Sequence, residues 1–213
     1  MASRKPVKGR RRQKRRLEKL LEEERPAWAE GKVIAGLDEA GAGPLAGPVM
    51  AGCVVLDPEK VGELLGVDDS KRLSAAKREE HAERIKECVR AWAVAEASVE
   101  EIDEINIRQA GLLAMRRAFD AVQKQVDINL LLIDARNLDD VDLEQRNLIG
   151  GDGRSLSIAA ASILAKVNRD KAMKAYAETY PEYGFDKHKG YGTAKHLEAL
   201  SKHGATPIHR KSF

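Results

Sequence analysis

Four carboxylates stand where the chain is expected to end a strand or to turn. Asp38 and Glu39 close one apolar run, Asp134 closes another, and Asp152 lies between two glycines. Any one of them alone could be a turn residue, a helix cap or a solvated side chain. Three segments that each bring an acid to one edge favour a shared role, because close carboxylates repel unless a cation holds them. The pattern therefore predicts a magnesium-type site, in which a few carboxylates surround an ion that keeps several waters.

These acids depend on strands for their positions. Residues 32–37 and 49–56 are apolar and rich in β-formers, and a turn rich in glycine and proline separates them. Residues 129–134 form a third run that is too short and too continuously apolar for a surface helix. Neighbouring residues of a strand point to opposite faces, so Asp38 and Glu39 can face one site only if the chain leaves strand geometry near Gly41.

The remaining elements alternate between helix and strand. Ser74 can cap a helix that follows it, and Thr193 can cap another that stops at Gly204. Periodicity predicts further elements that lack such clear ends: a strand over residues 92–97 and helices over residues 102–123 and 159–176.

Composition favours one layered domain. With 213 residues the chain is long enough for one core and too short for two sizeable domains. Aromatic residues make up only 4%, so aliphatic side chains packed between helices and strands must supply the core, which favours α/β over a sandwich or barrel. No apolar run reaches the roughly 18–20 residues of a membrane helix or resembles a signal peptide. Cys53 and Cys88 lack C-x-x-C spacing and are interpreted as reduced core thiols, so we expect a cytoplasmic protein.

The first 30 residues differ from the rest in charge. Nine of the 37 Lys and Arg residues precede the first acid, Glu18, so residues 1–16 carry +9. The remaining 28 bases face 34 acids, which gives the chain from Leu17 onward a charge of −6. We expect residues 1–30 to be a flexible tail with a short helix over residues 17–24. A solubilising extension and a transit peptide are alternatives to the favoured hypothesis, an arm that attracts nucleic acid.

Residues 36–49, GLDEAGAGPLAGPV, closely resemble the signature of the ribonuclease HII (type 2 ribonuclease H) family. The resemblance continues, in the family's order, over residues 69–71, 134, 151–152, 157–167, 188–193 and 209–213. It covers residues 33–213 and implies an α/β, ribonuclease H-like fold. That fold has a mixed central β-sheet flanked by helices and a C-terminal helical segment, and residues 31–213 would form the catalytic domain.

The resemblance implies that Asp38, Glu39, Asp134 and Asp152 are the catalytic residues and the metal ligands. Two divalent ions, Mg²⁺ or Mn²⁺, would activate the attacking water and stabilise the leaving 3′ oxygen, with Asp38 as the candidate bridging ligand. The expected reaction is hydrolysis on the 5′ side of a ribonucleotide embedded in duplex DNA, and of the RNA strand of RNA/DNA hybrids. The products would carry 3′-hydroxyl and 5′-phosphate ends. We expect a monomer with no membrane partner that serves ribonucleotide excision repair and DNA replication.

Contacts to the substrate follow from the same resemblance. Main-chain groups of Gly41, Ala42 and Gly43 are expected to read the 2′-hydroxyl, the group that distinguishes RNA from DNA. The family has an arginine where this chain has Ala42, so a phosphate contact should be lost while the amide readout survives. Tyr191 is expected to pack on the deoxyribose after the ribonucleotide, although a lone tyrosine is more often a surface or core aromatic.

Lys71 and Lys166 are further expected to hold phosphates, and a solvated helix lysine is the ordinary alternative for each. His188 has no assigned role. Two other functions stay open: a type 3-like ribonuclease H that needs longer RNA tracts, and a non-catalytic nucleic-acid-binding module. The presence of all four acids argues against the second.

Overall fold

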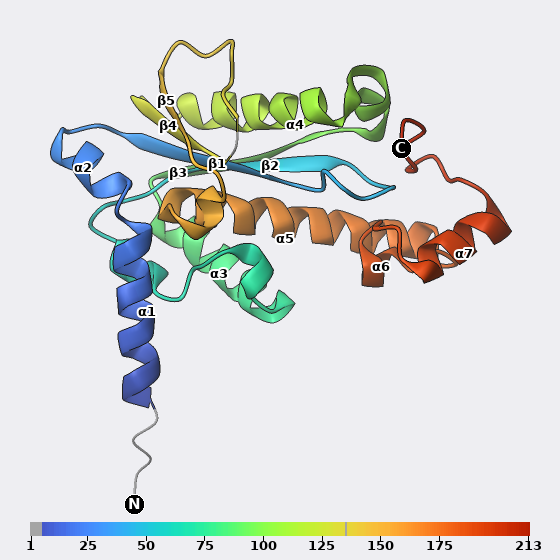
Figure 1. Ribbon diagram of the computed structural model, residues 1–213, viewed down its shortest axis with the longest axis horizontal. Helices are drawn as coiled ribbons and strands as arrows, with labels where there is room; N and C mark the ends of the chain where they lie inside the picture. The colour runs from blue at the N-terminus through green and yellow to red at the C-terminus, as the bar shows by residue number, and fades with distance from the viewer. Residues whose placement is uncertain (1–5, 135) are drawn as a thin grey trace, which may run out of the picture.

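The computed structural model describes residues 6–134 and 136–213, built around one five-stranded sheet (Figure 1). The strands are β1 (Ile34–Ala40), β2 (Val49–Val55), β3 (Ala91–Ala97), β4 (Leu130–Ile133) and β5 (Glu144–Asn147). Their order is β3-β2-β1-β4-β5. The β1–β2 and β2–β3 pairs are antiparallel, whereas β1–β4 and β4–β5 are parallel. The predicted mixed α/β architecture is confirmed.

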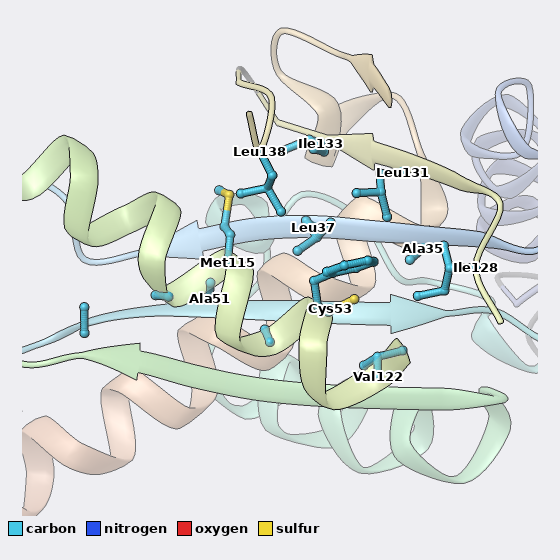
Figure 2. Close-up of a cluster of buried hydrophobic side chains, with 14 of the residues drawn as sticks. Ala35, Leu37, Ala51, Cys53, Met115, Val122, Ile128, Leu131, Ile133 and Leu138 are labelled. Atoms are coloured by element: carbon cyan, nitrogen blue, oxygen red, sulfur yellow. The ribbon is translucent and has the colours of Figure 1, made fainter. Parts of the chain in front are cut away.

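Helices cover both faces of the sheet. Helix α4 (Val99–Gln123) packs on one face, and α5 (Leu156–Thr179) packs on the other together with α3 (Ala75–Cys88) (Figure 1). Figure 2 shows the core on the α4 side, where side chains from β1, β2 and β4 lie under the helix. Helix α5 lies so close to the sheet that a Cβ on Gly36 would come within 2.2 Å of the Ser157 backbone. Glycine in β1 is therefore what lets α5 approach the strand that carries two of the acids.

The predicted helix ends are confirmed where a side chain caps them. The hydroxyls of Ser74 and Thr193 accept hydrogen bonds from the backbone N–H of Lys77 and His196, and the last helix ends at Gly204. The elements between Gly150 and Gly204 are η3 (Gly151–Gly153), α5, α6 (Phe185–His188) and α7 (Ala194–His203).

Three features were not predicted. Helix α4 begins at Val99 and contains a break at Asn106, whose φ of 69° is left-handed and whose Oδ1 accepts from the N–H of Arg108 and Gln109. Asn106 thus caps the second part of the helix from inside it. Strand β5 is polar and mostly exposed, so it lacks the apolar signal by which the other strands were recognised.

The third unpredicted feature is the extent of helix at the N-terminus. Helix α1 spans Pro6–Leu20 and is followed by α2 (Glu24–Ala29), where a single short helix over residues 17–24 was expected. Leu17, Leu20 and Leu21 are buried in the core cluster that also contains α3 and α5 residues. The second half of the expected tail therefore packs on the domain, because its leucines complete that core. The division of the chain at residue 30 stays a prediction.

Two smaller observations complete the fold. Cys53 and Cys88 are buried and unpaired in the described structure, as expected for core thiols. None of the helices in residues 6–134 and 136–213 has an apolar stretch long enough to cross a bilayer.

A buried carboxyl joins α2 to the start of α5. Glu24 is fully buried, and its Oε1 accepts from the Ser155 hydroxyl at 2.6 Å, from the Ser157 hydroxyl at 2.9 Å and from the Ser157 N–H at 3.0 Å. Burial raises the pKa of Glu24, and the three hydrogen bonds oppose that shift. This carboxyl therefore caps α5 from a distant part of the chain and fixes the N-terminal helices on the domain.

We predict that Glu24→Ala will lower the free energy of unfolding by about 2 kcal/mol or more, because three buried donors lose their acceptor. Glu24→Gln should cost less, since an amide oxygen can accept the same bonds. Because the pKa of Glu24 is raised in the folded protein, the wild type loses stability as the pH rises through that pKa, whereas the Gln variant does not. The stability difference between wild type and Glu24→Gln should therefore be smaller at pH 8 than at pH 5. Urea unfolding measures all three proteins, with exposed Glu22→Ala as control. Equal stability of the Ala and Gln variants would contradict the capping role.

Candidate active site

The four acids come together where β1, β4 and η3 end. Asp38 and Glu39 lie in β1, and Asp134 follows the last residue of β4. Because Leu37 pairs with Ile133 and the Asp134 N–H bonds the Leu37 carbonyl at 3.2 Å, Asp38 and Asp134 occupy matching places on adjacent strands. The parallel pairing of β1 with β4 is what brings them together.

Strand geometry persists past both acids of β1. We expected the chain to leave the strand so that Asp38 and Glu39 could share a face, but β1 stays paired through Ala40, and Gly41 turns the chain with a φ of 102°. Asp38 consequently lies on the α5 side, near Ser162, and Glu39 lines a cavity on the α4 side. The exit at the glycine comes two residues too late to change this alternation. The two carboxylates are nevertheless close enough at the end of the strand that the charge of Glu39 raises the pKa of Asp38, so they lie at one edge of the sheet without sharing a face.

Asp38 is the most buried acid in β1, with 6% of its surface exposed. Its Oδ1 accepts from the Glu39 N–H at 2.8 Å. Burial, followed by the charge of Glu39, raises the pKa of Asp38 well above its usual value, and Asp134 and Asp152 add to the shift. A hydrogen bond from Ser162 opposes it. The ionised form of Asp38 is therefore held at a cost in the metal-free protein.

Glu39 and Asp134 line one cavity of about 290 Å³ at the edge of the sheet, together with Ala42 and residues of α4. Burial raises the pKa of Glu39, and the charge of Asp134 raises it further. The pKa of Asp134 is also raised by burial, although the N–H groups of Gly150 and Gly151 donate to its carboxylate. An open cavity bounded by two carboxylates gives a substrate access to this edge.

Asp152 is buried in η3, where left-handed Gly150 turns the chain to present it. Lys71 Nζ lies 3.0 Å from Asp152 Oδ2. Asp69 fixes the start of this lysine's turn by accepting from the Lys71 N–H at 2.8 Å. Burial is the largest influence and lowers the pKa of Lys71, but the hydrogen bond to Asp152 and the charges of Asp152, Asp69 and Asp38 together outweigh it, so the net shift is upward. Lys71 thus supplies one positive charge to a group of acids.

The donor set fits a hard divalent cation, since all four candidate ligands are carboxylates and three of them have pKa values raised by burial and by one another. A cation would relieve that repulsion. Within the described residues, no three carboxylate, thiol or imidazole groups are already arranged around one ion position.

Two buried arginines, which we did not predict, hold the turn after β1. Arg210 donates to the carbonyls of Gly41, Ala42, Pro44 and Gly47 at 2.7–3.1 Å. Arg169 donates to those of Ala46, Pro48 and Lys189 at 3.0 Å each. Neither guanidinium forms an ion pair in the described part of the chain; backbone carbonyls accept from both, and the Arg210 guanidinium also lies 5.0 Å from the centroid of the Phe213 ring. Burial and the charge of Arg169 lower the pKa of Arg210 to about 10, which leaves it protonated at neutral pH.

The arginine bonds determine which polar groups of the turn are free. Its carbonyl oxygens face the guanidinium groups, whereas the N–H groups of Ala42 and Gly43, both exposed, have no hydrogen-bond partner among the described residues. An indication of Arg169 existed in the sequence, because it shares a helix face with Ala165 and Met173, both buried. For Arg210 no such periodicity was available.

Tyr191 lies beside the same turn. Its Cε1 is 3.8 Å from the position of a Cβ on Gly43, and its side chain is 44% exposed. The Leu45 N–H bonds the Gly190 carbonyl at 2.9 Å, which joins the two segments. The predicted glycine turn and the predicted tyrosine therefore meet, although they lie about 150 residues apart in the sequence.

Buried histidines support the Tyr191 segment from below. His196 Nδ1 is 2.9 Å from the Tyr191 carbonyl, and His196 Nε2 is 3.0 Å from His209 Nε2. Burial lowers the pKa of both imidazoles. His188, which had no assigned role, accepts from the Gly190 N–H and bonds the Tyr183 carbonyl. These rings link the Tyr191 turn to the C-terminal segment that carries Arg210.

Lys166, a predicted phosphate contact, forms an ion pair with an acid that is not one of the four candidate metal ligands. Its Nζ lies 2.6 Å from Asp170 Oδ1, one helical turn further along α5. A phosphate would have to compete with that carboxylate for the ammonium group.

Comparison with known proteins decides the family. The family model described as Ribonuclease HII matches residues 35–213, nearly the whole domain. The chain belongs to the ribonuclease HII family. A ribonuclease HII from Nitrosomonas europaea is 55% identical over 184 residues, which are 86% of this chain and 83% of that relative. Membership at this identity makes the chain an endoribonuclease, a hydrolase of the ribonuclease H kind.

Solved structures agree with the fold. Ribonuclease H2 from Pyrococcus horikoshii OT3 superposes with a TM-score of 0.72 at 25% identity, covering 84% of this chain and 93% of that one. Bst-RNase HIII in complex with Mn²⁺ gives a TM-score of 0.64 at 19% identity, covering 80% and 70%. The predicted ribonuclease H-like fold is confirmed.

We predict that Arg210→Met will lower the free energy of unfolding by about 3 kcal/mol or more, because the carbonyls of buried Gly41, Pro44 and Gly47, and that of Ala42, lose their donor. The free energy of unfolding of Arg210→Lys should lie between those of wild type and Arg210→Met, since an ammonium group keeps the charge but reaches fewer carbonyls. Exposed Arg146→Met, which breaks a surface ion pair, is the control and should change stability by no more than about 0.5 kcal/mol. A Met variant as stable as wild type in urea unfolding would contradict the role of Arg210 in holding the turn.

Proposed function

We propose that this endoribonuclease cuts on the 5′ side of a ribonucleotide embedded in duplex DNA, and cuts the RNA strand of RNA/DNA hybrids, leaving 3′-hydroxyl and 5′-phosphate ends. The observation that carries the proposal is the convergence of Asp38, Glu39, Asp134 and Asp152 on one sheet edge, with a cavity beside them. The same proposal places the protein, as a monomer in the cytoplasm, in ribonucleotide excision repair and DNA replication.

These four acids are the proposed catalytic residues and metal ligands. When bound, two Mg²⁺ or Mn²⁺ ions supply an activated water and stabilise the charge on the leaving oxygen. The Mn²⁺ in the HIII neighbour supports a divalent ion. Asp38 has the most central position, since its pKa is influenced by each of the other three acids. Lys71, whose side chain is 79% exposed, neutralises Asp152 and is free to turn towards a phosphate when a cation takes over that task.

The turn and the tyrosine are the proposed reader of the sugar. The unpartnered N–H groups of Ala42 and Gly43 can donate to a 2′-hydroxyl, and the carbonyl of Gly41 is held back by Arg210. Tyr191, half-exposed beside Gly43, presents a ring face to the neighbouring sugar. Because the contacts at position 42 come from the main chain, alanine serves there for readout. Lys166 is proposed to reach a phosphate only by leaving Asp170.

A type 3-like ribonuclease H is the second candidate, because Bst-RNase HIII has the same fold. It differs in substrate, since it would need longer RNA tracts. Comparing cleavage of a duplex that carries one ribonucleotide with cleavage of a long hybrid separates the two. Efficient cleavage of the single ribonucleotide supports the type 2 function, and cleavage of the hybrid alone would overturn it.

We predict that Asp38→Asn, Asp134→Asn and Asp152→Asn will each lower the single-turnover cleavage rate by a factor of about 10³ or more, because each removes a charged metal ligand at nearly constant volume. The metal-free Asp38→Asn protein should be more stable than wild type at neutral pH. The pKa of Asp38 is raised, so wild type loses stability as pH rises through that pKa and the amide does not. Asp139→Asn, in a loop outside the group, is the matched control. A cleavage rate near wild type for Asp38→Asn would contradict the assignment.

Tyr191→Ala is predicted to reduce cleavage at a single embedded ribonucleotide more than cleavage inside a long RNA tract, because the lost contact is to a deoxyribose. Tyr191→Phe keeps the ring and should retain most of the preference. The measurement is kcat/KM on both substrates for all three proteins. Equal losses on both substrates would mean that Tyr191 has a structural role only.

A further inference from the structure

Helix α1 carries a strongly basic surface that the catalytic site does not use. Between residues 9 and 17 the chain has six basic residues and no acid. Five of them are exposed and form no ion pair in the described structure; we call them the basic segment: Arg10, Arg11, Arg12, Lys14 and Arg15. Three consecutive positions among these five point their side chains around more than half of the helix circumference. In Figure 1 this half of α1 extends away from the rest of the molecule.

The helix is nevertheless fixed at its other end. Leu17 and Leu20 are buried against α3 and α5. Arg16, the one basic residue of this stretch that is paired, bonds Asp68 through its Nε at 2.9 Å. A helix anchored by apolar packing and an ion pair keeps its direction, whereas a disordered arm would not. The charges of the basic segment therefore have a defined place relative to the domain.

The end of α1 at Arg16, in contrast to the basic segment itself, lies next to the proposed active site. Asp68, which binds Arg16, adjoins the turn in which Asp69 holds the N–H of Lys71, and Lys71 reaches Asp152. Arg16 Nη2 also lies 3.9 Å from the position of a Cβ on Gly153, the neighbour of Asp152. Arg16, which we call the root of α1, therefore lies against both the Asp68 turn, which leads to Lys71, and the Gly153 turn, which carries Asp152.

Charge decides what this surface attracts. The chain from residue 17 onward carries −6, so much of its surface repels phosphate, while the basic segment attracts it. Arg10 to Arg15 extend about 7.5 Å along the helix, a length over which duplex DNA carries about four phosphates.

We propose that α1 is a fixed phosphate-binding arm that holds the duplex flanking the cleavage site. The choice of duplex as ligand rests on the proposed function. The arm acts on substrate binding, because its basic residues lie beyond the root and away from the four acids.

The test is a triple variant, Arg11→Gln, Arg12→Gln and Arg15→Gln, which keeps helix propensity and leaves Arg16 and Leu17 in place. Binding of a labelled duplex with one ribonucleotide is measured in EDTA by fluorescence anisotropy at several salt concentrations. We expect the Kd at low salt to rise about tenfold and the slope of log affinity against log salt to become shallower by about 2. With metal present, KM should rise similarly while kcat stays within about twofold.

A charge-matched control separates the arm from general electrostatics: Lys60→Gln, Lys124→Gln and Lys171→Gln remove three exposed charges from other elements. This control should change Kd by less than about threefold. In a second experiment the duplex is shortened from about 20 to about 4 base pairs, first on one side of the ribonucleotide and then on the other. Shortening one of the two sides should abolish the difference in Kd between wild type and the arm variant, since a short flank leaves the arm no phosphates.

Three results would overturn the proposal: an unchanged salt slope, equal losses in the control variant, or a difference that persists on both trimmed duplexes. Because binding is measured without metal, it tests the arm even if the protein does not cleave the duplex. Loss of cleavage on every duplex by wild type, with binding intact, would instead count against the proposed function alone.

Discussion

Four carboxylates gathered at the ends of β1, β4 and η3 repel one another, and the surrounding structure accommodates that repulsion. Burial and mutual charge raise the pKa values of Asp38, Glu39 and Asp134. Lys71 offsets part of the charge through Asp152, and the N–H groups of Gly150 and Gly151 offset more at Asp134. A divalent cation would relieve this repulsion, which is why we propose the edge as a metal site.

The positive charges that hold the turn after β1 are stabilised in a different way from the carboxylates. Arg169 and Arg210 are buried without carboxylate partners in the described structure and are surrounded by backbone carbonyls. A guanidinium group has five N–H donors in one plane, so it needs several acceptors at fixed positions. A turn whose carbonyls accept from these donors can adopt only a narrow range of conformations. The two arginines thereby fix the carbonyl groups of the turn, while the N–H groups of Ala42 and Gly43 have no hydrogen-bond partner among the described residues. A turn held in one shape beside a group of carboxylates is the combination that the proposed reaction requires.

Much of this could be predicted from the sequence, and the failures have physical causes. Apolar runs and capping residues marked the strands and several helix ends, because burial and unsatisfied N–H groups impose local signals. Strand β5 and the inner cap at Asn106 escaped, since polar edge strands and helix breaks carry no such periodicity. The four acids were singled out by their place at strand ends or, for Asp152, between two glycines, and the fold brings these segments to one edge. Arg210 was missed because its partners lie more than 160 residues away, and only the folded chain reveals them.

The most direct test of the account examines the ends of the products. A duplex carrying one ribonucleotide is incubated with the protein in Mg²⁺, in Mn²⁺ and in EDTA, and the fragments are analysed by mass spectrometry. Water-mediated cleavage by metal-binding carboxylates predicts a single nick on the 5′ side of the ribonucleotide, with a 3′-hydroxyl and a 5′-phosphate, in either metal and no product in EDTA. Cleavage in EDTA would contradict the assigned metal-dependent chemistry. A fragment ending in a 2′,3′-cyclic phosphate would contradict it too, because that product forms when the ribose hydroxyl is the nucleophile.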